Sequence, residues 1–259
     1  MAGSARRRAA GAALVALVVG SLGADASADV GTRKPLRRFT ATAGVSYSDG
    51  DYGDRPDARI VSLPVSLKYQ RGPWTTKLTV PFVQIRERRV RRGSTLSSSD
   101  QGIGDVIASA SYTFAPWSDS APSIALTGKL KLPTAAEGLG SDRFEYTSKI
   151  ELSRTFYDRF TPYFELGYRV RERSSAASGG NQLLGALGFS YSVTPSLTVG
   201  LAHDYRARSR SGLTDSRELV PSASIVLSRS TRLGLYGVIG LSDASPDLGA
   251  GMTLSYRFD

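Results

Sequence analysis

The feature that most constrains this chain is a long and regular alternation of apolar and polar residues. In the last run, one set of alternate positions (one parity) is apolar, and the other set holds Gly, Thr, Ser and Arg. The apolar positions are Leu248, Ala250, Met252, Leu254, Tyr256 and Phe258. A period of two places successive side chains on opposite faces of a β-strand. The run therefore predicts a strand with one apolar face and one polar face.

The pattern recurs in about twelve runs, each about 9–12 residues long. They lie at 39–47, 58–69, 74–86, 103–114, 122–132, 146–156, 160–171, 182–193, 197–206, 217–228, 231–241 and 247–258. A soluble β-sandwich also alternates, but ordinary strands average about 5–6 residues, whereas bilayer-spanning strands need about 9–11. The polar parity is also rich in Gly, Ser and Thr, which suit a confined, wet interior. The sequence predicts an all-β fold, a transmembrane antiparallel up-and-down β-barrel of about twelve strands.

The connections between the runs alternate in length. Tight turns are expected at 70–73, 115–121, 157–159, 194–196 and 228–230, and longer loops at 48–57, 87–102, 133–145, 172–181, 207–216 and 242–246. Short turns at one end and long loops at the other are typical of outer-membrane barrels, in which the short turns face the periplasm. Because only helices and closed barrels satisfy every backbone group in lipid, we expect the sheet to close.

Residues 1–28 have the pattern of a secretory signal peptide. Arg6, Arg7 and Arg8 precede a nearly all-apolar stretch at 9–20, and 26–28 is an Ala-Ser-Ala cleavage site. The apolar stretch is too short for a membrane helix, which needs about 20 residues. We expect export, cleavage after Ala28 and a mature barrel over 29–259. Removal of three Arg and one Asp lowers the net charge from +10 to +8, so the mature protein stays basic.

Aromatic residues lie near the ends of the runs, where the interfacial girdles of a barrel are expected, although packing within a sheet is an alternative. They are Tyr47, Tyr69, Trp74, Phe82, Phe114, Phe156, Tyr191, Tyr205, Tyr256 and Phe258. The run 254–258 resembles the closing-strand signal of Gram-negative outer-membrane proteins, which the barrel-assembly machinery recognises. Here Asp259 follows the last aromatic residue.

A motif at 101–106, Gln-Gly-Ile-Gly-Asp-Val, resembles the Gly-Leu-Gly-Asp-Leu signature of the MetA-pathway phenol-degradation family of outer-membrane proteins. Segments 122–134, 139–142 and 161–165 continue the resemblance, which is clearest over 100–171. It implies a barrel with a transport role, and the family name implies aromatic or apolar solutes. Gly102 and Gly104 would allow a tight backbone where a loop enters a strand. Asp105 would then either pair with interior Lys or Arg, or only cap the turn.

The polar parity carries charges that we expect to face the interior, because a charge on the lipid face costs about 2–4 kcal/mol at the membrane midplane. The candidates are Lys68, Lys77, Asp105, Lys129, Lys131, Lys149, Glu151, Glu165, Arg169, Arg171, Asp204, Arg206 and Arg257. Opposite charges could pair and brace the wall, or the excess of Lys and Arg could attract anionic solutes. A barrel of twelve strands lies between filled small barrels and open large ones.

The densest charge run falls in the predicted loop after 86, with candidate anion-binding residues Arg86, Arg88, Arg89, Arg91 and Arg92. The paired N–H groups of an Arg guanidinium match the geometry of a phosphate, so these residues could bind phosphates of outer-leaflet lipopolysaccharide. The alternative is a loop that only contacts solvent. Nucleic-acid binding is not expected, because no recognition motif is present.

An enzyme is a weaker hypothesis. The chain has no Cys and one His, which excludes thiolate chemistry and the usual multi-His metal sites. His203 shares parity with apolar residues and should face outward, where a lipid-hydrolysing barrel could use it, but no Ser-Asn-Gly signature follows. A purely structural or surface-interaction barrel is a third class. We expect a non-enzymatic outer-membrane channel for small solutes, with no metal or cofactor.

Overall fold

The computed structural model describes residues 37–50, 52, 58–91, 94–172, 180–209 and 214–258. The predicted signal peptide lies outside them. The described strands are β1 (Arg37–Gly50), β2 (Ala58–Arg71), β3 (Trp74–Arg91), β4 (Ser94–Ile103), β5 (Ile107–Phe114), β6 (Ser123–Lys131), β7 (Glu145–Ser153), β8 (Phe160–Arg171), β9 (Gln182–Thr194), β10 (Leu197–Arg206), β11 (Ser216–Val226), β12 (Thr231–Gly240) and β13 (Leu248–Phe258).

The described residues contain no helix that is long and apolar enough to cross a bilayer.

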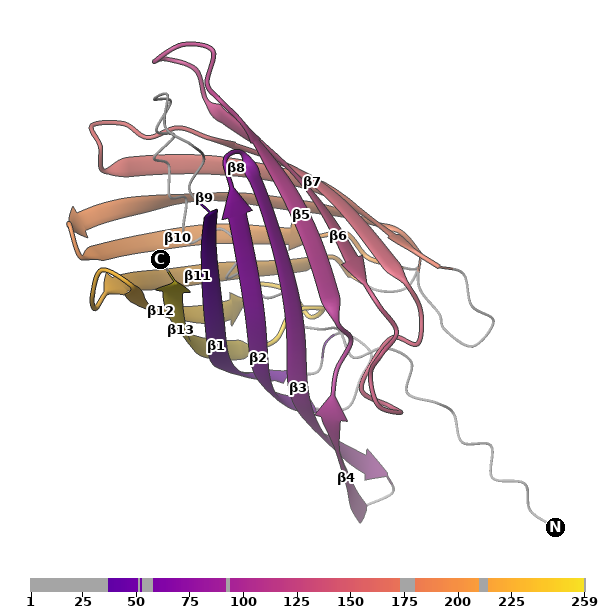
Figure 1. Cartoon of the computed structure of the whole chain (residues 1–259). Helices are drawn as coiled ribbons and strands as arrows, with labels where there is room; N and C mark the ends of the chain where they lie inside the picture. The colour runs from indigo at the N-terminus through magenta and orange to yellow at the C-terminus, as the bar shows by residue number, and fades with distance from the viewer. Residues whose placement is uncertain are drawn as a thin grey trace.

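Antiparallel pairing joins the strands into one closed barrel (Figure 1). From β1 to β4 and again from β5 to β13, each strand pairs with the next in sequence, and β1 pairs with β13 to complete the circle. The strands β4 and β5 both pair with β3, one after the other along its length, so they share one place in the wall. The wall therefore has twelve places, which confirms the predicted fold.

The two faces of the wall differ as the alternation predicts. On the outer face Val65, Trp74 and Leu254 are 58%, 56% and 50% exposed, and most other large exposed apolar residues share this parity. On the inner face Thr79, Thr147 and similar small polar residues are buried. A globular protein that folds in water would bury such large apolar side chains. Their exposure indicates that the outer face contacts the hydrocarbon of a bilayer.

Aromatic side chains pair at the end that carries the short turns. Trp74 contacts Tyr112 with ring centroids 4.9 Å apart, and Tyr256 contacts Phe258 at 5.0 Å. Phe39 contacts Tyr69 at 4.8 Å on neighbouring strands. These rings form part of the aromatic belt expected of an interface.

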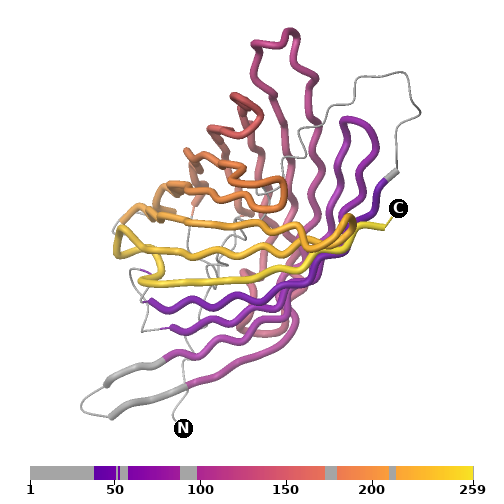
Figure 2. The backbone as a smooth tube through the Cα atoms, turned by 90° about the vertical axis from the view of Figure 1, so that its left-hand side faces the viewer, coloured from indigo at the N-terminus to yellow at the C-terminus, as the bar shows by residue number. Residues whose placement is uncertain are grey.

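The predicted long loop at 87–102 is wrong. Strand β3 continues to Arg91 and β4 begins at Ser94, and the two pair from Phe82 to Arg91. The hairpin extends past the neighbouring strands in Figure 1, and Figure 2 shows the same barrel wall turned by 90°. Both strands are polar in this hairpin, so the alternation that marks a membrane strand is missing. Backbone pairing in water does not need an apolar face, and the strands therefore form without it. The other long connections lie at the same end of the barrel.

Two apolar clusters lie on the inner face. Ile60, Val83 and Ile85 pack with Leu139 of the β6–β7 connection. The second cluster, on β10, β11 and β12, consists of Ala202, Val220, Tyr236 and Val238. The interior is thus packed by its own side chains at these places, rather than being wet throughout.

The assignment of the two faces predicts different reactivities for neighbouring cysteines. The chain has no native Cys, so Leu254→Cys and Ser255→Cys would each carry a single thiol. A thiolate forms readily in water but is disfavoured in hydrocarbon. We expect a water-soluble maleimide to label Ser255→Cys faster than Leu254→Cys in lipid vesicles, while both react equally after denaturation. Faster labelling at position 254 would contradict the assignment.

Candidate functional site

The break between β4 and β5 is the point at which the wall contacts the β6–β7 connection. Between the pairs Phe82–Ile103 and Thr79–Ile107, β3 has two residues and the segment that joins β4 to β5 has three. Residues 104–106 therefore form a bulge. The N–H of Gly104 still donates to the carbonyl of Pro81, at 2.8 Å, and closes the gap. A bulge re-aims a side chain, and here Asp105 becomes 1% exposed.

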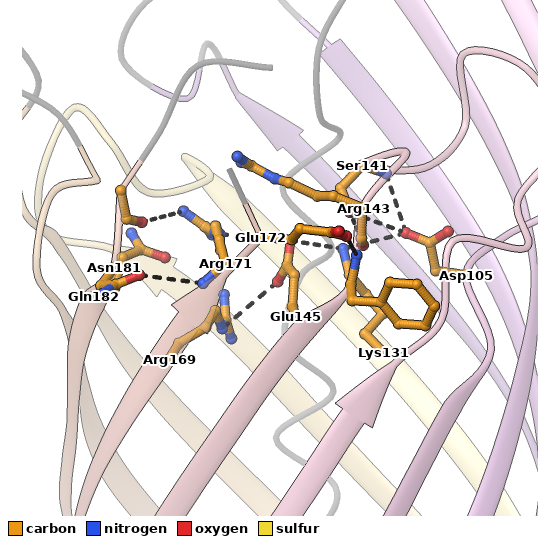
Figure 3. Close-up of polar contacts among 12 residues, drawn as sticks. Asp105, Lys131, Ser141, Arg143, Glu145, Arg169, Arg171, Glu172, Asn181 and Gln182 are labelled. Atoms are coloured by element: carbon orange, nitrogen blue, oxygen red, sulfur yellow. Dashed lines mark hydrogen bonds and ion pairs between the residues drawn. The ribbon is translucent and has the colours of Figure 1, made fainter. Parts of the chain in front are cut away.

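Asp105 holds the β6–β7 connection, residues 132–144, which we call the inner loop. Its carboxylate accepts hydrogen bonds from the backbone N–H of Ala135, at 3.2 Å, and of Ser141, at 3.1 Å. The hydroxyl of Ser141 donates at 3.4 Å, and the ammonium of Lys131 lies 3.2 Å from the same oxygen (Figure 3). Asp105 therefore both pairs with an interior cation and organises the loop.

Glycines make the close fit of the inner loop possible. A Cβ at Gly140 would lie 2.5 Å from the Cβ of Ala135 and 2.6 Å from an oxygen of Asp105. A Cβ at Gly102 would lie 3.1 Å from a methyl group of Leu139. The loop also donates from the N–H of Ala136 to the carbonyl of residue 103, at 2.9 Å. The motif predicted from family resemblance is thus the part of the wall on which the inner loop packs.

Lys131 connects Asp105 to a second carboxylate, Glu145, at the start of β7. The ammonium lies 2.8 Å from Glu145, and two guanidinium nitrogens, of Arg169 and Arg171, lie 3.8 Å and 3.5 Å from its oxygens. We call Lys131, Glu145, Arg169 and Arg171 the Glu145 cluster (Figure 3). Their side chains are only 9–17% exposed. Removing one partner of such a pair leaves a buried charge without compensation.

Two further ion pairs lie on the same inner face. Lys149 contacts Glu165 on the neighbouring strand. Arg206 lies 2.9 Å from Glu218, which also accepts from the hydroxyl of Ser216 at 3.0 Å. These pairs join β7 to β8 and β10 to β11, and they brace the wall as cross-strand charge pairs do.

The cross-strand register places twelve of the thirteen predicted interior charges on the inner face, and contacts with the inner loop and Lys131 place Asp105 there. In the described part of the chain, however, five of them form no ion pair: Lys68, Lys77, Lys129, Glu151 and Asp204. Arg257 donates from its guanidinium to the carbonyl of Arg229, at 2.8 Å, at the short-turn end. The bracing interpretation thus covers only part of the set.

Sequence reasoning missed Glu145, Glu218, Ser141 and the buried Arg143. Glu145 continues the parity of Thr147 and lies one residue before the predicted run, so a longer run would have included it. Glu218 belongs to a predicted run but shares its parity with Val220, which is 2% exposed and apolar. No sequence signal places Ser141 beside Asp105, because their contact joins residues 36 positions apart.

The predicted loop arginines lie on or beside β3. Arg86 is exposed on the outer face, opposite Arg59 and Ser99. The backbones of Arg88, Arg89 and Arg91 belong to β3, but their side chains, and all of Arg92, lie outside the described set. His203 is exposed on the outer face between Leu187 and Leu219, as its parity predicts.

A carboxylate also organises the β10–β11 connection. Asp215 accepts a hydrogen bond from the backbone N–H of Arg208 and another from the hydroxyl of Tyr205, both at 2.9 Å. These two donors hold the pKa of Asp215 below its usual value. The long-loop end is therefore fixed at two carboxylates, Asp105 inside the barrel and Asp215 at its rim.

A closed antiparallel barrel with an apolar outer face and a charged inner face defines the class of outer-membrane β-barrels. Within this class, the chain belongs to the family described as "Putative MetA-pathway of phenol degradation", whose model matches residues 58–258. This membership confirms the resemblance seen in the sequence. No curated protein sequence matches the chain.

Two solved structures have similar folds. The COG4313 outer membrane channel from Pseudomonas putida F1 has a TM-score of 0.67 and 14% identity, covering 88% of this chain and 97% of that chain. The NanC porin has a TM-score of 0.53 and 10% identity, covering 85% and 99%. At these identities the likeness shows the fold alone.

The contacts of Asp105 predict a large effect of its removal. Asp105→Ala would leave the ammonium of Lys131 with one fewer partner and two loop N–H groups without an acceptor. We expect the free energy of unfolding to fall by about 3–5 kcal/mol, the cost of breaking a buried charge pair. Urea titration of the protein in lipid vesicles measures it. Asp142→Asn, which changes an exposed carboxylate of the same loop, is the control; equal effects of both substitutions would contradict this role.

Proposed function

We propose that this protein is a channel of the Gram-negative outer membrane through which small solutes diffuse. The observation that carries the proposal is the inner face, where Gly, Ser and Thr accompany charged side chains that have no ion-pair partner among the described residues. A barrel that only anchors itself in lipid would favour a fully paired or apolar interior. Membership of the phenol-degradation family supports transport and suggests aromatic or apolar compounds as one class of solute.

The inner loop would set the width of the passage. It enters the barrel, packs Leu139 against Ile60 and Val83, and is held by Asp105. Selective diffusion depends on such a constriction together with the charges that line it. The proposed mechanism therefore needs no catalytic step, metal or cofactor.

The proposal extends to targeting and partners. The leader at 1–28 would direct export and be cleaved after Ala28, and the β13 end would be recognised by the barrel-assembly machinery. Outer-membrane lipid would contact the apolar face. The arginines at the end of β3 would bind phosphates of lipopolysaccharide, which is consistent with the length of the β3–β4 hairpin beyond the other strands.

A surface-interaction barrel is the second candidate, favoured by the same hairpin. Residues 94–100 of β4 are Ser and Thr apart from one Leu and one Asp, and they pair with β3 beyond the apolar part of the wall. If surface interaction were the main function, removing the part of the β3–β4 hairpin beyond residue 86 would abolish the surface interaction of cells. The ion conductance of the barrel would stay unchanged. A channel would keep its solute uptake.

The channel proposal predicts a conductance that the inner loop limits. We expect the refolded protein to give ion currents in planar bilayers, and Gly140→Val to increase them because the added methyl groups would displace the loop from Asp105 and Ala135. Gly128→Val is a matched control, since a Cβ there meets nothing within 4 Å. No current at any salt concentration, with no uptake defect on deletion, would contradict the proposal.

The absence of catalysis is tested separately at His203. The wild-type protein should not hydrolyse phospholipid in mixed micelles, and His203→Ala should behave identically. Hydrolysis by the wild type that disappears in His203→Ala would show that the outer face carries an enzyme site.

A further inference from the structure

One continuous row of inner-face residues crosses most of the barrel. Each member is the direct cross-strand partner of the next, from β13 through β1 to β9: Arg257, Thr40, Lys68, Lys77, Ser109, Lys129, Thr147, Arg169 and Gln182. We call these nine residues the basic row. Directly opposed residues share a face and have Cβ atoms about 4.5–5.5 Å apart. The row holds five cations, three hydroxyls and one amide, and no carboxylate.

The basic row runs between the two ends of the barrel. Arg257 lies one residue before the end of β13, at the short turns, and Gln182 begins β9, at the long loops. Strands in a barrel tilt by about 35–45° from its axis, so a row across the strands climbs as it goes round. The cations therefore mark a path along the passage rather than a ring at one depth.

Three cations of the row have no carboxylate partner in the part of the chain that the structure describes: Lys68, Lys77 and Lys129. Lys68 directly opposes Lys77, and like charges in this position destabilise a sheet. Other interior cations, such as Lys131 and Arg206, contact carboxylates. The positive charge of the row is thus left available to a ligand.

Four of the interior acids lie on strands β7, β8, β10 and β11. A second row joins Glu151, Glu165, Ala186, Asp204 and Glu218 from β7 to β11. Lys149 and Arg206 contact two of these acids. Between β13 and β6, Asp105 is matched by Lys131, and Glu87 and Asp100 lie toward the long-loop end of β3 and β4. None of these three acids belongs to the basic row, which therefore keeps its positive charge.

We propose that the basic row is a path for small anions, in particular monocarboxylates, which move from cation to cation along one wall. The inference rests on the proposed channel function and names its class of solute. Lys is a point charge on a flexible stem, which suits brief contacts better than a fixed bidentate site. Thr40 and Ser109 can donate hydrogen bonds to a carboxylate between the cations. Several weak sites in series allow both entry and release.

Reversal potentials across planar bilayers test the proposal, with a gradient of potassium chloride and then of potassium acetate. We expect the wild type to prefer the anion with both salts. Lys77→Gln should reduce this preference, and Lys77→Glu should reduce the anion-to-cation permeability ratio by about tenfold, which corresponds to about 1.4 kcal/mol. Arg59→Gln and Arg59→Glu make the same charge changes at a side chain that is 66% exposed on the outer face, and they should leave the ratio unchanged.

The possible outcomes separate the two proposals. Currents that prefer cations, or an anion preference that the Lys77 and Arg59 variants change equally, would overturn the basic row and leave the channel intact. Absence of current from a protein that shows the heat-dependent gel mobility of a folded barrel would overturn the channel itself, and the path with it.

Discussion

Backbone hydrogen bonding in hydrocarbon is the constraint on which the rest of this structure depends. No water is available there, so every N–H and C=O within the bilayer must find a partner in the protein. The pairing of β1 with β13 closes the wall into a ring. Once closure satisfies the backbone, the apolar parity is free to face lipid, and the other parity can be polar without contacting hydrocarbon.

The inner face uses this freedom in two ways. Around Asp105 and Glu145, charges are matched and buried, and they hold the inner loop against the wall. Along the basic row, Lys68, Lys77 and Lys129 have no such match within the described ranges of the chain. A matched cluster fixes a shape, whereas unmatched cations create a potential that a diffusing solute can sense. The two arrangements adjoin at Arg169, which belongs to both.

Much of the fold could be predicted from the sequence, because the period of two reports directly on two different surroundings. Lys77 and Leu78 are adjacent in sequence, yet the alternation alone assigns them to opposite faces, as the structure does. The same reasoning failed at 87–102, where β3 and β4 pair outside the expected apolar zone and carry no alternation. The predicted run at 146–156 also began one residue too late, after Glu145. A single charged residue at the edge of a run resembles part of a loop.

The site was less predictable, since it depends on contacts and register between distant residues. The family motif marked Gly102, Gly104 and Asp105 as special, but the sequence does not show that Asp105 binds Ser141 or that Gly102 makes room for Leu139. The alternation placed Lys68, Lys77 and Lys129 on the inner face. Only the register of three strand pairs, β2–β3, β3–β5 and β5–β6, aligns them in one row, apart from Glu151 and Asp204.

Anomalous diffraction from crystals soaked in bromide tests the central claim most directly, because bromide is an anion that can be located without assuming transport. We expect bromide peaks inside the barrel beside Lys68, Lys77 and Lys129, and none near Glu151 or Asp204. An interior without bromide, or bromide bound only to arginines on the outer surface, would contradict it.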